Sequence, residues 1–166
     1  MRALRYLLMG TALLTILVMP TGSPAEVCSE GGTVTPAKGK IFNNVMNDGK
    51  TFGVVALNLN GEKIKCAITG DPLPPDPVFP LKFIHTIICE DHSQVSFLTQ
   101  GNITGLLQIC SPDFAAFSFR EVSTPDLTSL SKGLFEGITG GSLTITGIVN
   151  CELEIDMNFE GHLCLP

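Results

Sequence analysis

Hydrophobic and polar residues alternate along most of the chain with a period of two, and this pattern is the first guide to its fold. β-Branched residues recur throughout, and Gly, Asn, Asp and Pro separate one run from the next. Beyond residue 25, no stretch carries apolar residues at the spacing of an amphipathic helix. Alternation places successive side chains on the two faces of a strand, so we expect an all-β protein.

The clearest predicted element is a hairpin centred on Asn60-Gly61. This dipeptide readily adopts the positive backbone angles of a two-residue type I′ turn. Such a turn places Leu57 opposite Ile64 and Val55 opposite Cys66, so the apolar faces of the two strands coincide. Turn chemistry and hydrophobic pattern therefore predict the same register.

Further strands follow from the same alternation. They are Lys40–Val45 and Thr51–Leu59 around a turn at Asn47–Gly49, Ser93–Gln100 and Ile103–Cys110 around a turn at Gly101-Asn102, and the separate runs Leu81–Glu90 and Phe114–Glu121. Between them, Asp71–Pro80 contains five prolines, which lack the amide hydrogens that a sheet needs. We expect this segment to be a surface loop, either a stiff connection or a presented binding loop.

The C-terminal third is the most regular part of the sequence. From Leu153 to Phe159, apolar residues alternate with acidic residues and one Asn, so one face should meet the core and the other water. A single strand over Ser142–Glu160 would be about 60 Å long, well beyond the usual length. We therefore expect the chain to reverse at Gly147 or at Asn150-Cys151.

One short helix is expected, from Pro125 to Lys132. Thr124 is a suitable N-cap, Pro125 fits the first turn and Gly133 can end the helix. With roughly eight to ten strands besides, the chain is predicted to form a single antiparallel β-barrel, with a β-sandwich as the alternative.

The first 25 residues resemble an export signal. Arg2 and Arg5 precede the apolar run Tyr6–Met19, and Ser23-Pro24-Ala25 offers a cleavage site near Ala25. The run is too short for a permanent membrane span, and no later apolar run is longer. We expect residues 1–25 to be a signal peptide and residues 26–166 to be one secreted or periplasmic domain without a membrane span.

The charge of that domain limits its partners. Without the first 25 residues, 8 basic residues stand against 16 acidic ones, a net charge of −8. Such a surface repels phosphate backbones, so nucleic acid and anionic membranes are poor candidates.

All six cysteines lie beyond the predicted cleavage site, and an even number in an exported chain indicates disulfides. Cys66 and Cys89 share the apolar-face parity of their strands and are joined through the proline-rich segment, so we pair them. A Cys151–Cys164 bridge is disfavoured because the extended run Leu153–Phe159 separates the two by roughly 20 Å. The remaining cysteines are assigned, without a geometric argument, as Cys28 with Cys164 and Cys110 with Cys151.

Residues with catalytic or metal-binding potential do not form a convincing site. On a strand, His85 and Cys89 stand about 13 Å apart, and neighbouring residues in Asp91-His92-Ser93 point to opposite faces. The carboxylates Glu152, Glu154, Asp156 and Glu160 have the spacing of a glycosidase pair or calcium ligands, but a solvated outer face explains them more simply. We assign no catalytic, cofactor-binding or metal-ligating residue and expect no cofactor.

One segment resembles a known family. The run from Gly133 to Gly147 is similar to the Phe-x-Gly-x-Thr-Gly stretch that joins two strands in dirigent and allene oxide cyclase-type barrels and in similar small exported bacterial proteins. Leu143 stands where that family usually has a small aromatic residue, and six cysteines are not part of its pattern. The resemblance implies an eight-stranded barrel with an apolar interior, and no catalytic residue is carried over.

These observations lead to three alternative functions. The first is a non-enzymatic protein that acts outside the cytoplasm, either structurally or by binding a small apolar ligand or a protein partner. The second is an enzyme, either a barrel isomerase or cyclase or a hydrolase that uses His85 with an acidic residue. The third is a protease inhibitor that presents Asp71–Pro80.

Overall fold

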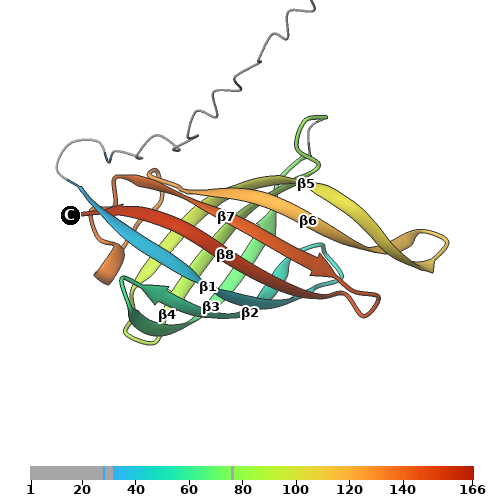
Figure 1. Ribbon diagram of the computed structural model, residues 1–166, viewed down its shortest axis with the longest axis horizontal. Coiled ribbons are helices and arrows are strands. Elements are labelled where there is room, and N and C mark those ends of the chain that lie inside the picture. Colours follow the sequence, from blue (N-terminus) through green and yellow to red (C-terminus); the bar gives the residue numbers. More distant parts are fainter. Residues whose placement is uncertain (1–27, 29–31, 76) are drawn as a thin grey trace, which may run out of the picture.

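The computed structural model describes Cys28 and residues 32–75 and 77–166, and it shows a closed antiparallel β-barrel (Figure 1). Each strand pairs with the next, and the last pairs with the first. The strands are β1 (Thr33–Val45), β2 (Thr51–Leu59), β3 (Glu62–Pro72), β4 (Leu81–Cys89), β5 (Gln94–Ser111), β6 (Phe114–Pro125), β7 (Gly140–Val149) and β8 (Glu154–Leu165). The predicted all-β barrel is confirmed, and the sandwich alternative is wrong. The predicted signal peptide, residues 1–25, lies outside the described residues.

Turn chemistry sets the register where the sequence predicts it. Asn60 and Gly61 form the β2–β3 turn with φ angles of 50° and 92°. The predicted pairs Leu57 with Ile64 and Val55 with Cys66 are both present.

The interior of the barrel follows from the alternation. In β2, residues 51, 53, 55, 57 and 59 are buried, whereas most of those between them are exposed. The apolar side chains that point inward from all eight strands form one continuous core. In the described part of the chain, no helix is long and apolar enough to span a membrane.

One end of the barrel is closed by the connection between β6 and β7. This connection contains the 3₁₀ turn η1 (Gly133–Phe135), whose Phe135 is almost fully buried beneath the strands. The Leu134 amide donates to Ser93 Oγ at 2.9 Å, and the backbones of Gln94 and Lys132 bond to each other. These bonds hold the connection against the β4–β5 turn. Apolar side chains, among them Phe135, fill this end of the barrel.

The predicted helix over Pro125–Lys132 is wrong. Pro125 is the last residue of β6 and lies opposite Phe97 on β5. The Asp126 side chain accepts hydrogen bonds from the backbone and hydroxyl of Thr128 and from the Ser129 hydroxyl. The residues that could cap a helix instead form a tight side-chain-stabilised turn, because here the chain leaves β6 and must cross the closed end of the barrel to reach β7.

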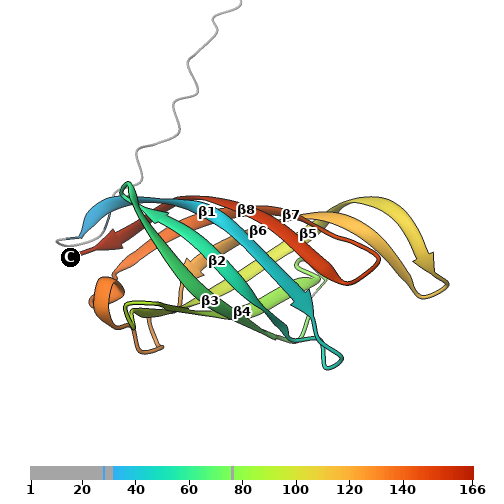
Figure 2. The same cartoon turned by 90° about the horizontal axis from the view of Figure 1, so that it is seen from below.

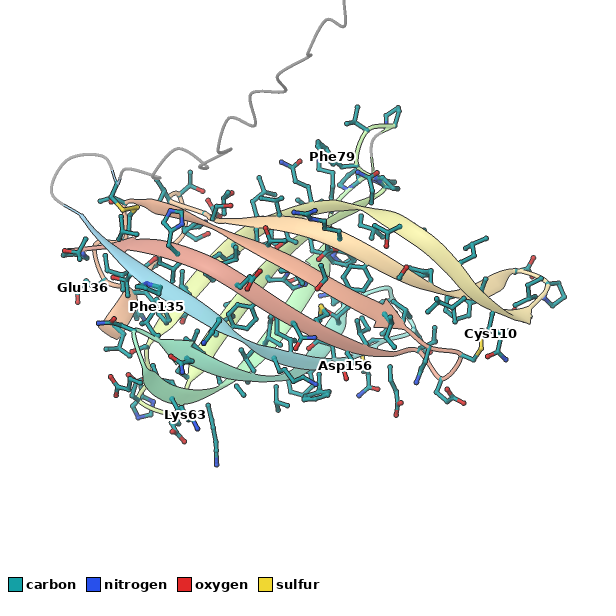
Figure 3. All side chains as sticks on the ribbon, in the orientation of Figure 1. Lys63, Phe79, Cys110, Phe135, Glu136 and Asp156 are labelled. Atoms are coloured by element: carbon teal, nitrogen blue, oxygen red, sulfur yellow. A yellow bond between two sulfur atoms is a disulfide. The ribbon has the colours of Figure 1, made fainter. Side chains whose placement is uncertain are left out.

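The opposite end, which we call the open end, carries the β1–β2, β3–β4, β5–β6 and β7–β8 connections. Here the β5–β6 hairpin projects beyond its neighbours, because β4 pairs with β5 only as far as Gly101 and β7 pairs with β6 only from Phe117 (Figures 1 and 2). The hairpin carries the exposed side chains Leu106 and Ile109. In Figure 3, Cys110 lies near its tip and Phe135 lies at the other end of the molecule.

The reversal points at the open end differ in part from expectation. The predicted turn at Gly101-Asn102 is wrong, since β5 continues through it and turns at Pro112-Asp113. The β7–β8 reversal occurs at residues 150–153, which agrees with the Asn150-Cys151 alternative and not with Gly147. Leu153 therefore belongs to this turn and not to the following strand. The predicted proline loop begins later than expected, because Asp71 and Pro72 still pair with β4.

Three disulfides link the described parts of the chain, and they are the pairs assigned from the sequence. Cys66 and Cys89 lie directly opposite each other on β3 and β4. Cys28–Cys164 anchors the N-terminal side of β1 to β8, and Cys110–Cys151 links the projecting hairpin to the β7–β8 turn. Disulfides of this kind are typical of proteins in oxidising compartments.

Candidate functional site

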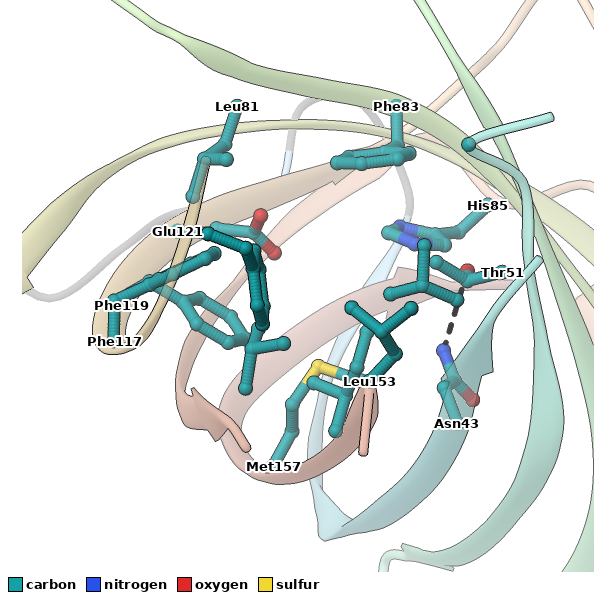
Figure 4. Close-up of a pocket in the computed structure, with 15 residues that line it drawn as sticks. Asn43, Thr51, Leu81, Phe83, His85, Phe117, Phe119, Glu121, Leu153 and Met157 are labelled. Atoms are coloured by element: carbon teal, nitrogen blue, oxygen red, sulfur yellow. Dashed lines mark hydrogen bonds between the residues drawn. The ribbon is translucent and has the colours of Figure 1, made fainter. Parts of the chain in front are cut away.

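A cavity of about 220 Å³ lies inside the barrel at the open end (Figure 4). Its walls are mainly apolar side chains from β1, β4, β6, β7, β8 and the β7–β8 turn. These are Val45, Leu81, Phe83, Phe114, Phe117, Phe119, Val149, Leu153, Ile155 and Met157. Four polar side chains, from Asn43, Thr51, His85 and Glu121, complete the lining with Gly49. A concave apolar space with a few polar groups is the usual form of a small-molecule site.

Large side chains limit the depth of this cavity. Below it lies a second space of only about 20 Å³, which is lined by core residues such as Phe97 and Phe159. His85 and Met157 border both spaces and so lie at the floor of the larger one. The smaller space has room for about one water molecule, so a ligand would be confined to the open end.

His85 points inward from β4 and is 7% exposed. Its Nδ1 lies 3.0 Å from Thr99 Oγ1, which in turn lies 2.8 Å from Ser123 Oγ. Its ring stacks on Phe83 with 5.3 Å between centroids. Burial lowers the pKa of His85 to about 4, although the charge of Asp71 opposes this shift. The imidazole is therefore neutral at pH 7.

Glu121 points inward from β6 and is 4% exposed. In Figure 4, its carboxyl group and the His85 ring both point into the cavity, from β6 and β4 respectively. Within the described ranges, no hydrogen bond or salt bridge reaches this carboxyl group. Burial raises its pKa to about 7, because the charged form loses its hydration.

Asn43 and Thr51 supply the remaining polar surface. Asn43 Nδ2 donates to Thr51 Oγ1 at 3.4 Å (Figure 4). Asn43 Oδ1 is buried and has no hydrogen-bond partner among the residues described. The polar lining is thus only partly satisfied by the protein itself.

The arrangement around His85 does not match a hydrolytic triad. A triad needs a nucleophile that bonds to the histidine and faces the substrate. Thr99 bonds to His85, but it is fully buried and does not border the cavity. No hydrogen bond between the described residues joins His85 to a carboxylate. His85 is therefore a packed histidine at one end of a buried chain of hydrogen bonds that continues through the hydroxyl groups of Thr99 and Ser123.

The other sequence candidates lie outside the cavity. Asp91, His92 and Ser93 occupy the β4–β5 turn at the closed end, where Ser93 Oγ donates to Asp91 and accepts from the Leu134 amide. These bonds hold the turn and η1 together. In the described part of the chain, no three His, Cys, Asp or Glu side chains are grouped closely enough to hold a metal ion.

The C-terminal carboxylates have separate structural roles. Glu154 accepts a hydrogen bond from Asn150 within the β7–β8 turn, and Asp156 forms an exposed salt bridge with Lys40 at 3.6 Å. Figure 3 shows Asp156 on the outside of the barrel. Their alternation with core residues therefore reflects an outer face, as the simpler interpretation predicted.

Glu121 is the cavity residue that sequence reasoning missed. Phe117, Phe119, Glu121 and Ser123 share one face of β6, so period-two parity places a carboxyl group among inward-facing residues. Comparisons of the chain with protein-family models, curated proteins and solved structures find no match. The geometry of the cavity is thus the principal guide to function.

Proposed function

We propose that this is an exported, non-enzymatic binding protein whose open-end cavity holds a small apolar ligand. The observation that carries the proposal is the apolar cavity of about 220 Å³ within an otherwise filled barrel. For comparison, an apolar cavity of roughly 150 Å³ is enough to bind benzene. The size therefore favours a compound of one ring or a short branched chain.

The construction of the open end supports this proposal. The Cys110–Cys151 disulfide fixes the projecting hairpin against the β7–β8 turn, next to the rim residues Phe114 and Leu153. A rigid rim lowers the entropy lost on binding. Three disulfides and the predicted signal peptide support a location in the periplasm or outside the cell.

The test is a titration of the folded, oxidised protein with toluene, followed by NMR of its methyl groups. We expect shifts at Val149 and Met157, and we expect the shift at Met157 to be abolished in Val149→Phe, which fills the cavity. The control is Ile148→Phe, because Ile148 is 45% exposed on the outer face whereas Val149 is 5% exposed. Both variants must retain the wild-type circular dichroism spectrum. Toluene shifts that persist in folded Val149→Phe contradict the proposal.

A second candidate is an isomerase or cyclase that acts in the same cavity. Glu121 favours it, because a buried carboxyl group with a pKa of about 7 can both accept and donate a proton near neutral pH. The similarity of residues 133–147 to dirigent and allene oxide cyclase-type barrels also supports this alternative. Turnover of an apolar substrate that is lost in Glu121→Gln would favour catalysis over binding.

A further inference from the structure

The Glu121 carboxyl group needs a partner that the described residues do not provide. It is 4% exposed, it borders the cavity, and no donor from the described residues reaches it. An ionised carboxylate that is buried without a partner is strongly unfavourable. A ligand in the cavity can supply the missing donor. The carboxyl group then favours ligands that carry a hydrogen-bond donor at the matching position.

The charges around the cavity indicate the sign of that donor. The described connections of the open end, with the strand residues next to them, contain five carboxylates and two lysines, and Arg120 of β6 is exposed on the outside of the barrel. The carboxylates and lysines are Asp48, Asp71, Asp113, Glu152 and Glu154 against Lys50 and Lys82. Lys50 forms a salt bridge with Asp71 at 3.0 Å. An acidic entrance attracts cations and repels anions, which favours a positively charged ligand group.

The residues that face Glu121 supply no positive charge. Gly101 on β5 and Ile145 on β7 lie opposite it in the sheet. His85 on β4 is the other titratable group of the lining, and its low pKa keeps it neutral at pH 7. Asp71, whose charge opposes the lowering of the His85 pKa, is an acid and supplies no positive charge. A cation beside Glu121 must therefore come from the ligand.

We propose that the ligand is a small apolar amine, whose ammonium group pairs with the Glu121 carboxylate while its apolar body fills the cavity. This inference rests on the proposed function and adds the charge and donor chemistry of the ligand. Pairing with a carboxylate in a site of low polarity is stronger than the same pairing in water.

The proposal fixes the direction of the pH dependence. Glu121 ionises as the pH rises through about 7, whereas an alkylammonium, like a lysine side chain, remains protonated to well above pH 8. Amine binding should therefore tighten from pH 6 to pH 8. A ligand that accepts a hydrogen bond from protonated Glu121, such as a ketone, would weaken over the same range.

Three probes of similar shape test this chemistry: benzylamine, benzyl alcohol and toluene. Each is titrated into the oxidised wild-type protein at pH 6 and pH 8, with binding followed by NMR. At pH 8 we expect benzylamine to bind about tenfold more tightly than benzyl alcohol or toluene, as a charge-assisted hydrogen bond predicts. The preference should decrease at pH 6.

Two matched variants locate the effect. Glu121→Gln removes the buried charge and should abolish the preference for benzylamine while toluene still binds. Glu160→Gln makes the same chemical change on an exposed residue of β8 and should leave the preference intact. Circular dichroism and the retained binding of toluene show that each variant is folded.

The outcomes separate this inference from the function on which it rests. If toluene binds and benzylamine binds no more tightly, the inference is wrong and the apolar site stands. A benzylamine preference that survives in Glu121→Gln, or one that increases at pH 6, also overturns the inference. If none of the three probes binds, both the inference and the proposed function are wrong.

Discussion

Glu121 on β6 lies directly opposite Gly101 on β5, and the absence of a side chain at Gly101 makes room for the buried carboxyl group. A Cβ atom at Gly101 would stand 2.5 Å from Glu121 Cγ and closer still to the backbone oxygen of Arg120. The position of the polar group in the cavity thus depends on a glycine in the neighbouring strand.

Gly101→Ala should destabilise the barrel because the new methyl group overlaps with β6. Overpacking of this kind typically costs about 1–3 kcal/mol in the free energy of unfolding. Urea denaturation measures the loss. Gly105→Ala is the control, since its Cβ would meet only the Ser118 hydroxyl, at 3.2 Å. Equal losses in the two variants would show that Gly101 is not required by the contact with Glu121.

The two buried titratable groups should act on stability in opposite directions. The pKa of Glu121 is raised from 4.5 to about 7, so its contribution is lost as the pH rises through that window. The pKa of His85 is lowered from 6.5 to about 4, so its contribution is lost as the pH falls from 6.5 to 4. Between pH 4.5 and 6.5 the two effects largely cancel.

Single variants should reveal each effect. In Glu121→Gln, stability should rise with pH from 4.5 to 6.5, and in His85→Gln it should fall over the same range, each by roughly 3 kcal/mol at most. Urea denaturation at several pH values provides the measurement. Parallel curves for the wild type and both variants would contradict the assigned burial of these groups.

Removal of the Cys110–Cys151 disulfide should loosen the open end. The bridge closes a segment with a sequence separation of 41, for which chain entropy predicts a loss of up to about 4 kcal/mol. The double variant Cys110→Ser/Cys151→Ser should also bind toluene more weakly. Unchanged binding despite reduced stability would show that the bridge does not organise the cavity.

The export prediction has a direct chemical test. When the full chain is expressed in a host that exports it, the protein recovered outside the cytoplasm should begin near Glu26. Its mass should correspond to three disulfides and no free thiol. An uncleaved protein, or one with reactive thiols after native isolation, would contradict an exported location.

Much of the fold could be predicted because local and long-range signals agree. Period-two alternation gave the strands, and Asn60-Gly61 gave the β2–β3 register. Gly101-Asn102 also has turn chemistry, yet β5 passes through it because β6 pairs with it on the other side. Thr124-Pro125-Asp126 likewise has the residues of a helix start. These residues end β6 and form a turn instead, because the chain must cross the closed end. Turn and capping residues therefore mispredict the local structure where pairing with a distant segment determines the path of the backbone.

The candidate site was less accessible to sequence analysis. His85 was recognised as a strand residue with catalytic potential, but its partner Thr99 is 14 residues away and depends on the β4–β5 register. The inward position of Glu121 follows from the parity of β6. The cavity itself does not, because it depends on how side chains from six strands and the β7–β8 turn fill one volume.

The central claim, that the open end holds an apolar cavity, can be tested most directly by crystallography of the oxidised protein under xenon pressure. Xenon occupies empty apolar cavities in proteins. We predict a xenon site between Phe83 and Met157, which is lost in Val149→Phe. A structure in which side chains fill this space and no xenon binds would contradict the account.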